Sequence, residues 1–227
     1  MAADLSPVYK ALPAPAPAAY SWTGCYVGIE GGGMWGQSQH VSTGSENPAN
    51  AGLPIDNKFN LSGGLVGGTI GCNYQFDPSW VVGLENDTSW TNTRGSANDL
   101  LPFNPAAVSQ TSEDWIDTLR GRIGFTWDRA LIYGTGGAAF AGTQVQVCSP
   151  FICVTDSKTR TGWTAGVGVE YAAWQNVSVK LEYLHADFGN AQYINPPVMG
   201  PAGGTVVTRN VSLTNDIVRA GLNWRFY

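Results

Sequence analysis

The sequence predicts an all-β protein, an eight-stranded antiparallel β-barrel that spans a membrane, with short turns at one end and four long loops at the other. Three observations predict it. Segments with an apolar residue at every second position recur along the chain, the gaps between them alternate between short and long, and no run of about 18 apolar residues is present to form a transmembrane helix. Closed barrels span bilayers with a much weaker hydropathy signal.

The composition agrees with this fold class and disfavours two others. Of the 227 residues 13% are charged, about half the usual share, while glycine is abundant and the chain holds nine Trp, nine Tyr and eight Phe. Few charges and many aromatic residues argue against disorder. The net charge of −5, without a run of Lys or Arg, argues against nucleic acid as a partner.

The first residues are predicted to form a linker. Residues 11–19 read ALPAPAPAA, a spacer of polyproline character that can join neither a sheet nor a helix. The start at residues 1–4 has no basic segment and no apolar core, so we expect no signal peptide there. The chain is then either a cytoplasmic protein or a mature chain that carries a start Met. We place the linker at 1–21 and the barrel at 22–227.

Eight strands follow from the period-two pattern. We expect them at 23–37, 59–76, 80–90, 113–127, 131–146, 161–173, 177–188 and 210–227. Tight turns are predicted at 77–79, 128–129 and 174–176, and long polar loops near 38–58, 91–112, 147–160 and 189–209. Short turns at one end and long loops at the other are typical of a bacterial outer-membrane barrel.

The two faces of the predicted strands differ in chemistry. One face is apolar, and Val82, Leu84, Val167 and Leu222 belong to it. The other carries five acids and five bases, which are Glu30, Glu85, Asp87, Arg120, Arg122, Glu170, Lys180, Glu182, Arg219 and Arg225. A soluble barrel or sandwich would turn the apolar face inward. We favour the opposite orientation, because a soluble exterior normally carries more charge and more Lys than this chain has.

The charged face is the predicted functional constellation. An eight-stranded barrel is just wide enough inside for side chains to fill it. The ten charges must then pair, because an unpaired buried charge costs several kcal/mol. They form either an ion path or a polar plug that closes the lumen, and we favour the plug because roughly 16–18 strands are typical of open aqueous pores.

Several segments together resemble one protein family. They are Tyr20–Gly28, Gly83–Asp87, Leu119–Gly124, Leu131–Gly137, Lys180–Leu184 and Val218–Phe226, together with the opening Ala2–Tyr9. In this order they resemble the alphaproteobacterial outer-membrane immunogenic (surface antigen) β-barrel family, over essentially the whole chain from residue 2. The resemblance implies an OmpA-like transmembrane barrel in the outer membrane of a Gram-negative cell, reached by secretion and assembly there.

The resemblance also implies partners. Gly221, Trp224 and Phe226 look like the family's C-terminal signal for the barrel-assembly machinery, from which the extra Tyr227 departs. The start at Ala2 is similar to that of members attached covalently to peptidoglycan, and Met1, if retained, would block such a tether.

The four cysteines are predicted to form two disulfides, Cys25–Cys72 and Cys148–Cys153. Cys25 and Cys72 fall on the same face of the first two strands and opposite each other, and the other two flank a short loop containing a Pro. The alternative for Cys25 and Cys72 is two free thiols that act as small apolar residues.

Other motifs predict no chemistry. Residues 31–36 spell GxGxxG but lie within a strand with no helix after it, so a phosphate cradle is not expected. His40 and His185 are remote from the cysteines, which argues against zinc. Neither histidine shares a strand end with Ser and Asp, which argues against a hydrolase. We expect no catalytic residue, no metal and no cofactor.

The resulting hypothesis is a structural, non-enzymatic outer-membrane barrel that supports envelope integrity and displays surface loops. Its expected partners are membrane lipid and lipopolysaccharide, with peptidoglycan and further copies of the chain as additional candidates. The alternatives are a small passive channel or a surface binder of apolar ligands such as haem, and a soluble barrel with an apolar cavity.

Overall fold

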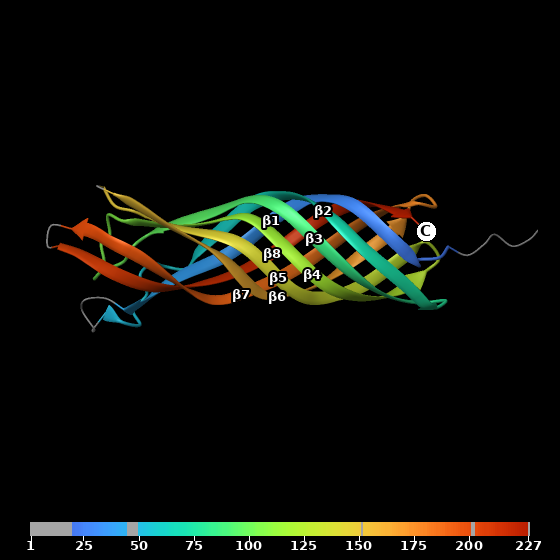
Figure 1. Ribbon diagram of the computed structural model, residues 1–227, viewed down its shortest axis with the longest axis horizontal. Helices are drawn as coiled ribbons and strands as arrows, with labels where there is room; N and C mark the ends of the chain where they lie inside the picture. The colour runs from blue at the N-terminus through green and yellow to red at the C-terminus, as the bar shows by residue number, and fades with distance from the viewer. Residues whose placement is uncertain (1–19, 45–49, 151, 201–202, 227) are drawn as a thin grey trace, which may run out of the picture.

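A computed structural model describes residues 20–44, 50–150, 152–200 and 203–226, and these residues form eight β-strands (Figure 1). The strands are β1 (Gly24–Gly44), β2 (Phe59–Asp77), β3 (Trp80–Asn98), β4 (Val108–Trp127), β5 (Ala130–Cys148), β6 (Cys153–Ala172), β7 (Val177–Gly200) and β8 (Gly203–Phe226). No helix among these residues is long and apolar enough to cross a membrane.

The strands close into one antiparallel barrel in chain order, which confirms the predicted fold class. Each strand pairs with the next, and β1 closes the ring by pairing with β8, where Cys25 lies opposite Phe226. The two chain ends of the barrel therefore lie at the same end as the three tight turns (Figure 1). We call this end the turn end and the opposite one the loop end.

The strands extend further toward the loop end than the sequence pattern predicted. β3 continues to Asn98 instead of residue 90, β7 to Gly200 instead of 188, and β6 begins at Cys153 instead of 161. Pairs such as Ser96↔Gln110 maintain the ladder there without apolar side chains. The apolar periodicity marked only the part of each strand with an apolar outer face, whereas backbone hydrogen bonds continue beyond it.

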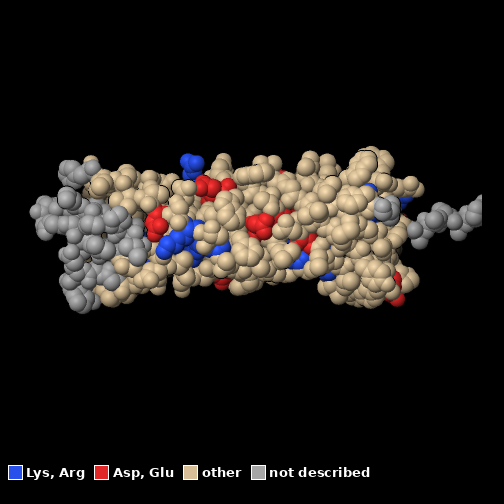
Figure 2. Space-filling model, viewed as in Figure 1, with Lys and Arg blue, Asp and Glu red and all other residues tan. Residues whose placement is uncertain are grey.

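The apolar face points outward. Leu84 is 65% exposed and Val167 62%, whereas Glu85 and Arg120 are each 1% exposed. Most of the face visible in Figure 2 is accordingly uncharged. This arrangement contradicts the soluble alternative, whose apolar face would be the core.

Exposed tryptophans mark the two borders of this outer apolar surface, which we call the apolar band. Those toward the loop end are Trp35, Trp90 and Trp163, and those toward the turn end are Trp80, Trp127 and Trp224. Trp90 and Trp163 lie within β3 and β6, because both strands extend beyond the predicted ranges 80–90 and 161–173. Aromatic girdles at such borders are typical of transmembrane barrels.

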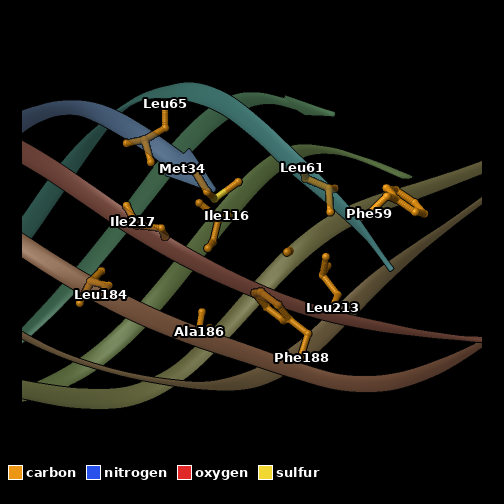
Figure 3. Packing of buried hydrophobic residues seen from close by; sticks show 12 residues of the cluster. Met34, Phe59, Leu61, Leu65, Ile116, Leu184, Ala186, Phe188, Leu213 and Ile217 are labelled. Atoms are coloured by element: carbon orange, nitrogen blue, oxygen red, sulfur yellow. The ribbon is translucent and has the colours of Figure 1, made fainter. Parts of the chain in front are cut away.

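The interior is layered, and it is not polar throughout as the sequence predicted. On the loop-end side of the charged residues lies an apolar cluster that includes Met34, Ile116, Leu184, Phe188 and Leu213, contributed by β1, β4, β7 and β8 (Figure 3). A smaller cluster with Trp22, Val81, Leu131, Tyr133 and Ala172 lies toward the turn end. These residues were not found in the sequence because they lie at inward positions that the charge pattern had assigned to the polar face.

Candidate functional site

The charged lumen lies between the two apolar clusters. All ten residues predicted for it point inward, and each is at most 4% exposed. They come from six strands, namely β1, β3, β4, β6, β7 and β8, so their side chains converge from around the barrel. Strict alternation along each strand places them inside, because successive side chains point to opposite faces of the sheet.

Arg120 lies at the centre of this network. Its Nη2 lies 2.6 Å from Oε1 of Glu85 and also contacts Asp87, while its Nη1 lies 3.0 Å from Oε1 of Glu182. Glu85 and Asp87 belong to the adjacent strand β3, but Glu182 belongs to β7, three strands away. A single guanidinium therefore links opposite walls of the barrel.

Arg219 and Lys180 connect the same acids from the other side. Nη2 of Arg219 lies 2.6 Å from Glu182 and 2.9 Å from Asp87, and its Nη1 contacts Glu30. The ammonium of Lys180 lies 3.1 Å from Glu30, with Glu85 at 3.3 Å and Asp87 at 3.5 Å. Gly221 leaves room for this lysine, because a Cβ there would meet its Cε at 3.0 Å.

Arg122 extends the network toward the turn end. Its Nη1 lies 3.1 Å from Glu170 and 3.5 Å from Glu85. Its guanidinium carbon lies 5.0 Å from the ring centroids of both Tyr26 and Tyr133. These tyrosines also donate their hydroxyls, Tyr26 to Glu85 at 2.5 Å and Tyr133 to Glu182 at 3.1 Å.

Sequence reasoning missed both tyrosines, although a signal was present. Tyr26 has the same parity as Glu30 along β1, so it must face inward with it. A phenol combines a ring that accepts a cation on its face with a hydroxyl that donates to a carboxylate. The tyrosines therefore fill the space between charges while adding hydrogen bonds.

Arg225 lies apart from the other nine charges. No carboxylate lies within salt-bridge distance of it among the described residues. Instead its guanidinium lies 4.8 Å from the ring of Trp22 and 5.1 Å from that of Tyr20, and it donates to the backbone oxygen of Ser21 at 2.9 Å. It therefore binds residues 20–22 into the turn end of the barrel.

The cysteines pair as 25–72 and 148–153. Each pair occupies directly opposite positions of neighbouring strands, β1 with β2 and β5 with β6. No free cysteine is found in the part of the chain that the structure describes, so the alternative of free thiols does not hold there.

The other candidate residues lie on the wall. Trp224 and Phe226 of the predicted assembly signal point outward, 58% and 46% exposed, whereas Gly221 faces inward. Tyr227 lies outside the described residues, as does most of the predicted linker with Ala2. The GxGxxG stretch is part of β1. No group of three potential metal ligands occurs in the described ranges.

A buried chain of polar side chains near the loop end escaped the sequence analysis. Nδ1 of His40 lies 2.8 Å from Asp56 and its Nε2 lies 3.1 Å from the hydroxyl of Thr111. Arg209 donates to the hydroxyl of Ser109 at 2.7 Å beside them. The order Asp, His, hydroxyl matches that of a hydrolytic triad. His40, Asp56 and Thr111 are all fully buried, however, so their arrangement holds the residues around Asp56 against the barrel wall.

Comparison with known proteins agrees with this architecture. Residues 8–226 match the outer membrane protein beta-barrel domain family. The 31 kDa outer-membrane immunogenic protein of Brucella melitensis is 32% identical, over 100% of this chain and 93% of that protein. The 25 kDa outer-membrane immunogenic protein of Brucella abortus is 29% identical, over 99% of this chain and 90% of that protein.

A solved structure supports the fold independently. The outer membrane protein OprG of Pseudomonas aeruginosa has a TM-score of 0.52 at 14% identity, with 91% of this chain and 99% of that one covered. The family match and the similarity to the Brucella proteins identify the chain as a member of the outer membrane protein beta-barrel domain family, located in the outer membrane of a Gram-negative bacterium.

Proposed function

We propose that the protein is a structural, non-enzymatic barrel whose filled lumen does not conduct, and that it supports the cell envelope and displays its four loops outward. The observation that carries the proposal is the contact of Arg120 with Glu182 across the lumen. A continuous aqueous path would have to separate opposite charges that are each almost fully buried. Breaking such a pair leaves an uncompensated buried charge, which costs several kcal/mol.

Two further layers support the same proposal. The apolar cluster with Met34 and Leu213 fills the barrel on the loop-end side of the charges. At the turn end, Trp22 is fully buried beneath Arg225. An ion would therefore meet two apolar layers besides the charged lumen, and dry apolar constrictions also oppose conduction.

Single-channel recording on the purified protein in planar bilayers tests the proposal. We expect no steady conductance, with an open porin inserted under the same conditions as the positive control. Steady, ion-selective conductance would overturn the plug and favour the small passive channel.

The proposed orientation places the turn end in the periplasm and the loop end at the cell surface. Residues 20–22 enter at the turn end, so the segment before them would start on the peptidoglycan side. We propose this segment as the tether to the cell wall through Ala2. Its test is mass spectrometry of muramidase-digested cell walls, in which a cell-wall fragment on Ala2 is expected and a free N-terminus in all copies would contradict the tether.

The loop end, which lies at the cell surface in this orientation, carries the proposed contact with lipopolysaccharide. His185 points outward near the border of the apolar band, with its Nδ1 2.9 Å from Asp216 and its ring 5.7 Å from that of Trp163.

We further propose that the barrel-assembly machinery reads Trp224 and Phe226, which are exposed on the last strand. Replacing Phe226 by Ser should reduce the amount of protein in the outer membrane, and unchanged insertion would contradict this role.

A further inference from the structure

The backbone ladder between β6 and β7 stops halfway up the barrel wall. It runs from Ala172↔Ser178 to Trp163↔Asp187, and residues 153–162 of β6 have no partner among the described residues of β7. The flanking ladders continue, since β5 pairs with β6 as far as Cys148↔Cys153. We call this gap, bordered by residues 153–162 of β6 and by β7 from Phe188 onward, the seam.

A bulge in β7 coincides with the start of the seam. The pairing of β7 with β8 shifts register between Asp187 and Asn190, and Gly189 has a φ of 57°. This left-handed conformation is open to glycine at little cost. Bulges bend a strand and end its pairing locally, which accounts for the departure of β7 from β6 at this height.

Arg160 spans the seam in place of the missing ladder. Its Nη2 donates to three backbone oxygens, those of Phe188 at 3.4 Å, Gly189 at 2.7 Å and Val211 at 2.7 Å. The first two belong to β7 and the third to β8. One side chain of β6 thus satisfies acceptors that a neighbouring strand would otherwise satisfy.

Lys158 makes a second bridge further toward the loop end. Its ammonium donates to the backbone oxygen of Gln192 and lies 5.1 Å from the ring centroid of Tyr193. Lys158 is 40% exposed at its side chain, so this bridge is weaker than that of buried Arg160. Charged side chains along an unpaired edge also oppose pairing with a foreign strand.

The closed seam leaves polar groups unsatisfied. Arg160 is 3% exposed, yet its Nε and Nη1 have no hydrogen-bond partner in the described part of the protein. A buried donor without an acceptor pays its desolvation cost in full. Opening would hydrate these donors, so the closed seam is held less firmly than a continuous ladder.

We propose that the seam between β6 and β7 opens reversibly in the loop-end half of the barrel, and that Arg160 is the latch that holds it closed. The ladder from Trp163 to Ala172 keeps the remainder of the wall shut. Opening uncovers Phe188 and the apolar cluster behind it without disturbing the charged lumen. Local opening of this kind occurs in the least stable part of a fold.

Hydrogen-exchange mass spectrometry on the full chain in detergent micelles tests the proposal. In the wild-type protein we expect amides at 188–193 to exchange at least about tenfold faster than those at 178–186, which lie on the paired part of the same strand. Equal protection of the two segments would overturn the proposal, whatever the variants show.

Two variants assign the latch to Arg160. Arg160→Gln should accelerate exchange at 188–193 at least about threefold and leave 178–186 unchanged, while Arg160→Lys should lie between it and the wild type. Arg94→Gln, on exposed loop-end sequence of β3, is the matched control and should change neither segment. Unchanged exchange in a folded Arg160→Gln protein would overturn the latch. If that variant does not fold, Arg160→Lys decides in its place, and wild-type exchange rates in that variant would overturn the latch as well.

Discussion

Arg120 on β4 and Glu182 on β7 form an ion pair across the barrel, with 3.0 Å between Nη1 and Oε1. The two strands are not neighbours, so this contact depends on the closure of the whole ring. The side chains that fill the lumen therefore also hold walls that are three strands apart at a defined separation.

Arg120→Ala should destabilise the protein by about 3 kcal/mol or more, because it leaves Glu85, Asp87 and Glu182 with less compensation in a desolvated site. Guanidinium unfolding in detergent, followed by tryptophan fluorescence, measures the change. Arg94→Ala, on the exposed face of β3, should stay within about 0.5 kcal/mol of the wild type. A change of that small size for Arg120→Ala would mean that the charges face water.

Trp22→Ala should destabilise by about 3–5 kcal/mol, the usual cost of truncating a fully buried tryptophan. The ring packs in the turn-end cluster and lies under Arg225. Trp174→Ala is the matched control, since Trp174 is 67% exposed in a turn at the same end. If both variants unfold at the same denaturant concentration as the wild type, residues 20–22 do not close the barrel.

Gly137→Ala should impair folding, whereas Gly136→Ala should not. A Cβ at Gly137 would lie 2.0 Å from the backbone oxygen of Leu119 and 2.7 Å from Cα of Arg120, so the backbone itself would have to shift. At Gly136 the nearest atom is 3.5 Å away, an ordinary contact. Overpacking of this kind costs about 1–3 kcal/mol. Yields of folded protein and unfolding midpoints of the two neighbours compare them directly, and equal values would contradict the packing argument.

Glu113 should make stability depend on pH. It lies two residues beyond Trp115, which pairs with the border residue Trp90, and so on the loop-end side of the apolar band. Burial raises the pKa of its carboxyl from 4.5 to about 7, against the opposing effects of the Asn215 hydrogen bond and the Arg160 charge. The pKa of Glu113 is higher in the folded state than in the unfolded state. The stability that its protonated carboxyl contributes is therefore fully present below about pH 4.5 and is lost as the pH rises through about 7.

The size of this effect follows from the pKa change. Between pH 4 and pH 8 the free energy of unfolding of the wild type should fall by up to about 3 kcal/mol more than that of Glu113→Gln, in which position 113 cannot titrate. Asp114→Asn removes the exposed neighbouring carboxylate and should keep the wild-type dependence. Parallel pH profiles for the wild type and Glu113→Gln would show that Glu113 does not titrate in this window.

Local pattern was sufficient for much of the architecture. Period-two alternation distinguishes the face of Leu84 from that of Glu85, because consecutive side chains point to opposite sides of any strand. The order of tight turns and long gaps then predicts eight strands with consecutive neighbours. Opposite placement of Cys25 and Cys72 follows from the same count along the first two strands.

Alternation could not predict how the interior is layered along the barrel axis or how far each strand extends. The inward positions of Met34 and Ile116 have the same parity as those of charged residues on their strands, and only the three-dimensional alignment of strands stacks them into an apolar layer. The extension of β3 and β6 was also hidden, because polar residues with exposed outer faces pair through the backbone alone.

The sequence by itself therefore determined which side chains share a face and that charges of both signs occur on one of them. Only the tertiary structure decided which charges meet, since Glu182 reaches Arg120 across the lumen while Arg225 is drawn to Trp22. The physical reason is that alternation is a property of one strand, whereas pairing depends on the stagger between strands and on ring closure. The same holds for the seam at Arg160, where two strands separate although each continues to pair with its other neighbour.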